Sequence, residues 1–74
     1  MVKLTDEDRR FINENFDEAH DMLHMYDVEG VLITIAKFIA AYCYDDEYEL
    51  TELGETAQAV YTRIYENNRE VLEK

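Results

Sequence analysis

Apolar residues recur every three to four positions over residues 5–26, which is the period of an α-helix with one buried face. The residues that share this face are Phe11, Ile12, Phe16, Ala19, Met22, Leu23 and Tyr26. Thr5, with Asp8 three positions later, has the spacing of a capping box, and acidic residues in the first turn suit the positive end of the helix dipole. The pattern predicts a first helix over about residues 5–26.

A second stretch, residues 28–44, is apolar around most of the helical circumference. Only a narrow strip near Thr34, Lys37 and Ala41 is suited to face water. Asp27 is placed to accept hydrogen bonds from the first free amides of this helix. Because one neighbour cannot cover so much apolar surface, the pattern predicts a central, largely buried second helix.

A third one-sided stripe follows an acidic connector. Its members are Leu53, Ala57, Val60, Tyr61, Ile64, Asn68 and Val71. Thr51 is the expected N-cap of this helix. Asn67 and Asn68 lower the helix propensity, so we expect the last turns to fray or bend there.

Together these segments predict an all-α fold, a small three-helix bundle formed by residues 1–74 as a single helical domain. The three helices are expected over about residues 5–26, 28–44 and 51–72. The chain has no proline and only two glycines, so a turn-rich β architecture is not expected. A chain of 74 residues buries only about 60% of the surface that its unfolded form exposes, so a partner or a second copy would add stability.

The apolar run over residues 31–44 is interrupted by Thr34 and Lys37 and falls short of the ~20 residues that a membrane span needs. No stretch of signal-peptide type precedes it, and a single cysteine forms no intrachain disulfide. We therefore expect a cytoplasmic protein that does not bind membranes.

Charge narrows the range of partners. The chain carries 18 acidic residues against 7 lysines and arginines, a formal net charge of −11. Residues 11–36 and residues 38–62 contain no lysine or arginine at all. A polyanion of this kind is repelled by phosphate backbones and anionic lipids, so direct nucleic-acid binding is not expected.

The acids of the first predicted helix form a first candidate partner-binding surface. They follow the spacing i, i+3, i+4, i+7 and are Glu14, Asp17, Glu18 and Asp21. Like charges at this spacing destabilise a helix by a few tenths of a kcal/mol, so their presence indicates a function, with solubility as the simpler alternative. On one helix face they would lie ~5–6 Å apart, a spacing comparable to that of phosphates along a nucleic-acid strand.

The connector before the third helix forms a second candidate surface, in which tyrosines alternate with acids. Its members are Tyr44, Asp45, Asp46, Glu47, Tyr48 and Glu49. Aromatic rings beside carboxylates bind arginine through a cation–π contact and a salt bridge together.

This charge pattern resembles that of DNA-mimicking inhibitors. The hypothesis is a non-enzymatic acidic module for protein–protein interaction, an inhibitor that occupies a basic nucleic-acid-binding surface of its target. The alternative is a small homodimeric helical bundle with a structural or regulatory role, in which the second helix supplies the seam.

Catalytic chemistry is not expected, and no cofactor or metal is predicted. The chain has no serine, two isolated glycines make no phosphate-binding loop, and a small bundle offers little room for a catalytic cleft. Cys43 is expected to be a packed thiol. His20 and His24 are four residues apart, so a divalent metal on the first helix is an alternative to plain surface histidines.

Overall fold

The computed structural model describes residues 2–73, and the chain is helical through most of this range. The helices are α1 (Asp6–Asn15), α2 (Ala19–His24), α3 (Val28–Tyr42), α4 (Glu52–Asn67) and α5 (Arg69–Leu72). The described residues form no β-strand, and a single antiparallel bridge joins Tyr44 to Leu50. The predicted all-α class is confirmed.

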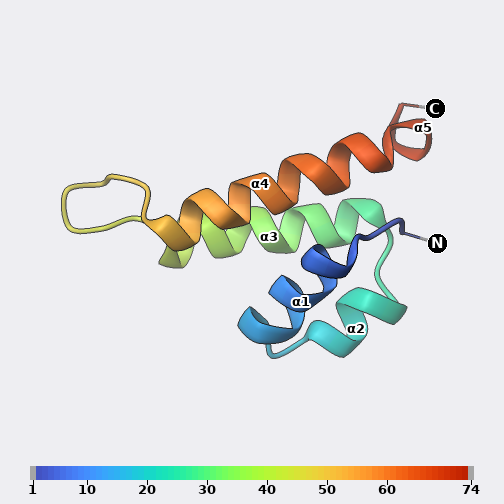
Figure 1. The fold of residues 1–74 in the computed structure, drawn as a ribbon, viewed down its shortest axis with the longest axis horizontal. Helices are drawn as coiled ribbons and strands as arrows, with labels where there is room; N and C mark the ends of the chain where they lie inside the picture. The colour runs from blue at the N-terminus through green and yellow to red at the C-terminus, as the bar shows by residue number, and fades with distance from the viewer. Residues whose placement is uncertain (1, 74) are drawn as a thin grey trace.

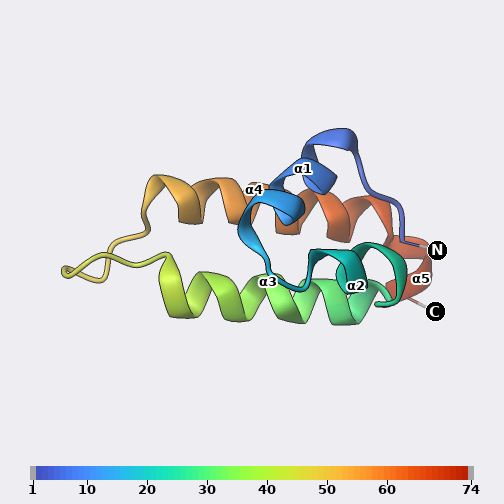
Figure 2. The ribbon, with the colours of Figure 1, turned by 90° about the horizontal axis from the view of Figure 1, so that it is seen from below.

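The helices form two layers. Helices α3 and α4 lie side by side and antiparallel, and the loop between them extends from one end of this hairpin (Figure 1). Helices α1 and α2 form a shorter pair that covers one face of the hairpin, with α1 packed on α4 (Figure 2). None of the helices within residues 2–73 is both long and apolar enough to cross a membrane.

The prediction of one continuous helix over residues 5–26 is wrong, because the structure has two helices there. Its start is as expected, since the Thr5 hydroxyl accepts from the Asp8 amide (3.1 Å) and the capping box is complete. Helix α1 nevertheless ends at Phe16, whose backbone is extended (φ −125°, ψ 128°), and α2 begins three residues later. The break turns the chain back, so that the two halves lie against the same face of the α3–α4 hairpin instead of forming one long rod (Figure 1).

The second predicted helix corresponds to α3, and its cap is confirmed because the Asp27 Oδ1 accepts from the Gly30 amide (2.8 Å). The buried residues of α3 follow one side of the helix and are Val28, Val31, Leu32, Ile35 and Ile39. The opposite side is exposed, including Ile33 and Ala36. A three-helix bundle with a central helix is therefore not confirmed, because α3 has neighbours on one side only among the described residues.

The third predicted helix is interrupted at Asn68, within the pair of asparagines where a bend was expected. Thr51 caps α4 as predicted, its hydroxyl accepting from the Gly54 amide (3.1 Å). Asn68 is buried, and its side chain donates to the carbonyl of Ile64 (2.7 Å). The asparagine side chain thus replaces part of the backbone hydrogen bonding that a continuous helix would have made.

A buried ion pair joins the two layers. The Asp8 carboxylate is fully buried and accepts from the Arg63 Nε (2.9 Å) and from the Thr5 amide (3.3 Å). The described residues also form one apolar core to which α1, α2, α3 and α4 all contribute. The largest fully buried side chains of this core are Ile12, Met22, Ile35 and Ile64.

Candidate functional site

The first predicted surface has a different geometry from the expected one. Glu14 belongs to α1, Asp17 and Glu18 belong to the turn, and Asp21 belongs to α2. The helical periodicity ends at Phe16, so the prediction of one ladder with phosphate-like spacing is wrong. All four acids are exposed, as a partner-binding role requires.

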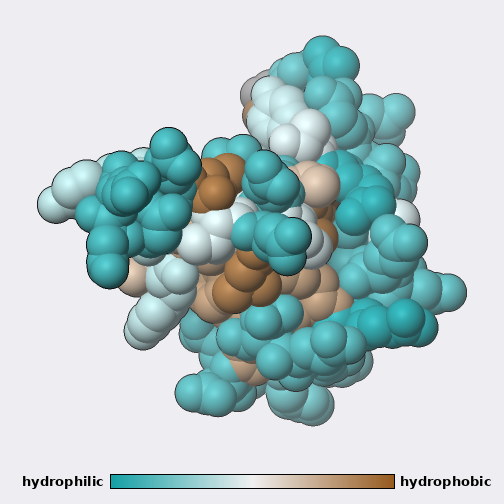
Figure 3. Space-filling view, turned by 60° about the vertical axis from the view of Figure 1, so that its left-hand side comes forward, coloured by the Kyte–Doolittle hydropathy of each residue, from teal (hydrophilic) through white to brown (hydrophobic). Residues whose placement is uncertain are grey.

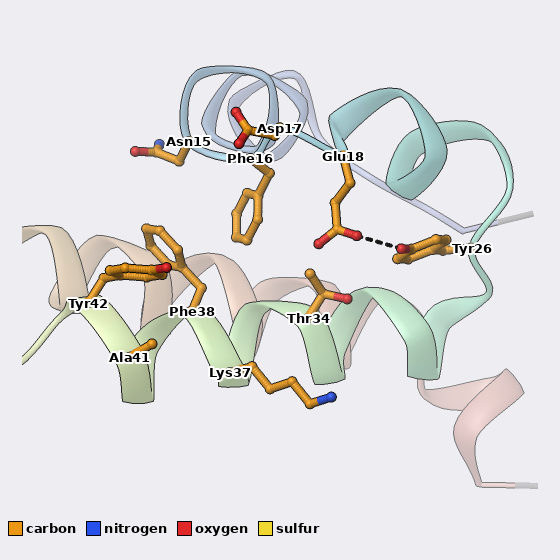
Figure 4. Close-up of a pocket in the computed structure, with 10 residues that line it drawn as sticks. All are labelled: Asn15, Phe16, Asp17, Glu18, Tyr26, Thr34, Lys37, Phe38, Ala41 and Tyr42. Carbon is orange, nitrogen blue, oxygen red and sulfur yellow. Dashed lines mark hydrogen bonds between the residues drawn. The ribbon is translucent and has the colours of Figure 1, made fainter.

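The turn between α1 and α2 instead forms one wall of an open cleft, which we call the α1–α3 cleft, and α3 forms the other wall (Figure 4). The cleft has a volume of about 860 Å³. The residues that line it are Asn15, Phe16, Asp17, Glu18, Tyr26, Thr34, Lys37, Phe38, Ala41 and Tyr42. Two acids of the first predicted surface therefore lie beside aromatic rings that sequence analysis did not associate with them.

Aromatic rings form a continuous apolar part of the cleft. The ring centroids of Phe16 and Phe38 lie 4.7 Å apart, and those of Phe38 and Tyr42 lie 5.7 Å apart. Phe11 packs edge-on against Phe16 (6.2 Å between ring centroids) and against Phe38 (6.3 Å), and it anchors this row in the core. Tyr42 is 73% exposed, so the outer end of the row is open to a partner.

Glu18 is held at the opposite end of the cleft by Tyr26. The Tyr26 hydroxyl donates to Glu18 Oε2 at 2.7 Å (Figure 4). This hydrogen bond raises the pKa of Tyr26, and partial burial and the negative charges of Glu18 and Asp21 raise it further. The bond leaves Oε1 of the Glu18 carboxylate free to accept from a ligand.

The second predicted surface is an ordered loop, which we call the acidic loop (residues 44–49). Asp45 organises it, since its Oδ1 accepts from the amides of Glu47 (2.8 Å) and Glu49 (3.0 Å). The Asp45 amide also donates to the Glu49 carbonyl (2.9 Å), and Thr51 closes the base through two hydrogen bonds to the Cys43 carbonyl. Asp45 was predicted to bind a partner, but its carboxylate already has a structural role.

Tyr48 projects from the acidic loop. Its side chain is 87% exposed, and its backbone has a positive φ of 61°. A left-handed conformation costs a non-glycine residue roughly 1–2 kcal/mol. Tyr44, at the base of the same loop, is 48% exposed. The loop thus displays two rings between the exposed carboxylates of Asp46, Glu47 and Glu49.

The acids of both surfaces keep their charge uncompensated. Within residues 2–73, ion pairs form between Arg63 and two acids of α1, and between Arg69 and two acids near the end of the chain. In that range no carboxylate of the first surface or the acidic loop lies within 4.0 Å of a basic nitrogen. Both surfaces therefore present net negative charge to solvent.

The sequence contains a sign of the cleft. Thr34, Lys37 and Ala41 were identified as a strip facing water on an otherwise apolar helix. In the structure all three line the α1–α3 cleft. A polar strip of this kind marks a side of the helix that no other element covers.

The remaining candidates from the sequence are the histidine pair and Cys43. His20 and His24 are exposed with ring centroids 4.8 Å apart, and no group of three or more potential ligands for a metal occurs in the described part of the chain. Cys43 is a buried free thiol, as predicted, and burial raises its pKa. A raised pKa lowers the thiolate fraction, which makes a nucleophilic role unfavourable.

Comparisons with protein-family models, with curated proteins and with solved structures find no match for this chain. Its function is therefore inferred from the geometry and charge of the two surfaces.

Proposed function

We propose that this chain is a non-enzymatic, acidic protein-binding module whose partner carries a basic surface. One observation carries the proposal: the acids of both surfaces are exposed, and within residues 2–73 none of them is paired with a basic side chain. Unpaired surface charge of one sign attracts an oppositely charged macromolecule over distances up to about a Debye length and accelerates association, most strongly at low salt.

The α1–α3 cleft and the acidic loop are adjacent at the end of α3. Tyr42 lines the α1–α3 cleft and is the last residue of α3, and the acidic loop begins two residues later. The view toward the loop end of the molecule shows an apolar area between hydrophilic regions (Figure 3). An apolar area beside a charged rim is the usual anatomy of a protein interface.

The narrower proposal is that the module is an inhibitor that occupies a nucleic-acid-binding surface of its target. Support for it comes from the net charge of −11 and from the two long segments without lysine or arginine. The phosphate-like ladder on α1 gives no support, because α1 ends before three of its four acids.

Affinity capture with matched variants tests the proposal. The immobilised chain is compared with a cleft variant (D17N/E18Q/D21N), a loop variant (D46N/E47Q/E49Q) and a control variant (E29Q/E55Q/E70Q) that removes the same number of exposed charges elsewhere. We expect basic proteins to bind at low salt, to elute at high salt, and to bind the cleft or loop variant less than the control variant. Equal losses in all three variants, or capture that does not depend on salt, would contradict the proposal.

Competition separates the inhibitor form from the general one. If the captured partner uses the same surface for nucleic acid, an excess of double-stranded DNA or of RNA will prevent its capture. If the chain still captures a partner that is saturated with nucleic acid, the inhibitor proposal is contradicted. The proposal of a protein-binding module would still stand.

A second candidate function, a homodimeric helical bundle, is favoured by a different face. Ile33 of α3 is 53% exposed, and Ala36 and Ala40, one and two turns later, are exposed as well. Beside them α3 and α4 alone line a shallow groove, away from α1 and α2. A second copy packed here would bury this apolar surface. Sedimentation over a range of concentrations tests this: a dimer that Ile33→Glu dissociates supports it, and a monomer at every concentration excludes it.

A further inference from the structure

We infer that the α1–α3 cleft binds an arginine side chain of the partner, an inference that rests on the proposed function and deepens it. The cleft joins two features that arginine needs and that lie far apart in the sequence. The turn supplies the carboxylates and Phe16, and α3 supplies Phe38 and Tyr42. The cleft is open to solvent, so the chain on either side of the inserted residue can remain outside it.

The carboxylate end of the cleft is preorganised. Glu18 Oε2 is bound to the Tyr26 hydroxyl at 2.7 Å, which fixes the carboxylate over the cleft, opposite Thr34 (Figure 4). Oε1 is free, and the exposed Asp17 carboxylate lies in the same wall. Fixing an acceptor before binding lowers the entropy cost of forming the charge-assisted hydrogen bond.

The aromatic side of the cleft selects the shape of the cation. Phe16 and Phe38 present ring surface along one side, and a planar guanidinium can stack on the Phe16 ring while its N–H groups reach the neighbouring Glu18 carboxylate (Figure 4). An ammonium group stacks less well and carries more tightly held water. A quaternary ammonium donates no hydrogen bond, so it would leave Glu18 Oε1 without a partner.

Lys37 does not neutralise the cleft. Its side chain points away from the turn, and among the described residues its ammonium forms no ion pair with Asp17 or Glu18 (Figure 4). The cleft therefore keeps two carboxylates against one lysine at its edge, which favours a cationic ligand over an anionic or neutral one.

Nuclear magnetic resonance titration with short peptides tests the inference. The probes are three capped glycine–serine peptides that are identical except for one central residue, which is arginine, lysine or citrulline. Citrulline has nearly the shape of arginine but no charge. We expect the arginine peptide to shift resonances of Phe16, Glu18 and Phe38, the lysine peptide to bind several-fold more weakly, and the citrulline peptide to cause no saturable shift.

Two pairs of variants assign the binding to the cleft. Glu18→Gln should weaken arginine binding about tenfold, whereas Glu14→Gln, an exposed acid outside the cleft, should leave it unchanged. Phe16→Leu should weaken it several-fold through loss of the ring face next to Glu18, whereas Tyr48→Leu should not. Equal binding of the three peptides, or equal effects within either pair, would overturn the inference.

The result also distinguishes this inference from the proposed function. If the arginine peptide shifts only resonances of the acidic loop, the inference that the cleft binds arginine is overturned. The proposal of an acidic module that binds basic partners would still stand. A chain that binds neither basic peptides nor basic proteins at low salt would overturn both.

Discussion

The buried side chain of Asn68 is hydrogen-bonded to both backbone groups of Lys3. Its Oδ1 accepts from the Lys3 amide at 2.8 Å, and its Nδ2 donates to the Lys3 carbonyl at 3.0 Å. The same Nδ2 donates to the Ile64 carbonyl at 2.7 Å. One carboxamide therefore joins the first described residues to the break between α4 and α5, across 65 positions of the sequence.

This geometry makes Asn68 a stability residue. Asn68→Ala removes all three hydrogen bonds and leaves the buried Ile64 carbonyl and the part-buried backbone groups of Lys3 without these partners, so we expect a loss of about 2–3 kcal/mol in the free energy of unfolding. Asn68→Asp should cost at least as much, because a carboxylate would face two carbonyl oxygens. Urea denaturation measures both. Asn67→Ala, at the exposed neighbouring position, is the control and should change stability little; equal effects at the two positions would contradict the assigned role.

The Asp8–Arg63 pair gives a second prediction. Asp8 is fully buried, whereas the Arg63 side chain is 35% exposed. Asp8→Ala leaves the guanidinium and the Thr5 amide without this acceptor, and we expect a loss of about 2–3 kcal/mol, less than for a fully buried pair. Glu7 binds the same arginine at 3.1 Å with a side chain that is 78% exposed, so Glu7→Gln should cost at most about 0.5 kcal/mol. Similar denaturation midpoints for the two variants would show that burial does not set the strength of these contacts.

Gly54 allows α4 to approach the start of the loop closely. A Cβ at this position would lie 2.5 Å from Leu50 Cδ1 and 2.8 Å from the Cys43 Cβ. We expect Gly54→Ala to destabilise the fold by about 1–3 kcal/mol, although alanine is the better helix former. Gly30→Ala is the matched control, since its nearest atom would be Asp27 Oδ1 at 3.1 Å. Thermal melts should show a clearly lower midpoint for Gly54→Ala; a midpoint as high as that of Gly30→Ala would contradict the close contact.

Local chemistry was sufficient to predict where α1, α3 and α4 start, but not the starts of α2 and α5, which have no side-chain cap. Thr5, Asp27 and Thr51 were each predicted as N-caps from the residues beside them, and each side chain accepts the expected amide hydrogen bond. Capping depends on three or four consecutive residues, so the sequence carries the whole signal.

The break at Phe16 depends on residues far away, so it could not be predicted in the same way. Its ring lies 4.7 Å from that of Phe38, a contact made only after the α1–α2 pair has folded onto α3. The apolar stripe of residues 5–26 satisfies helical periodicity whether or not the chain turns at its middle. The α1–α3 cleft was missed for the same reason, because it exists only through this turn.

The Tyr26–Glu18 hydrogen bond predicts a pH dependence. The neutral phenol donates to the carboxylate, and a phenolate would be repelled by Glu18 and Asp21, so the pKa of Tyr26 is raised above its ordinary value near 10 in the folded state. A raised pKa in the folded state means that the bond stabilises the fold fully below pH ~10, and that this contribution is lost as the pH rises through the raised value. Carbon-13 resonances of the tyrosine rings report each titration separately.

Neutralising Glu18 should reverse this shift. In Glu18→Gln the charged acceptor is gone and only Asp21 still repels the phenolate, so we expect the pKa of Tyr26 to fall toward 10. Glu14 is not among the groups that raise the pKa of Tyr26, so Glu14→Gln should leave this pKa unchanged. A Tyr26 titration that is the same in Glu18→Gln as in the native chain would show that the pair does not form in solution. The carboxylate proposed to receive arginine would then lack its support, because the fixed position of Glu18 in the cleft depends on this one bond.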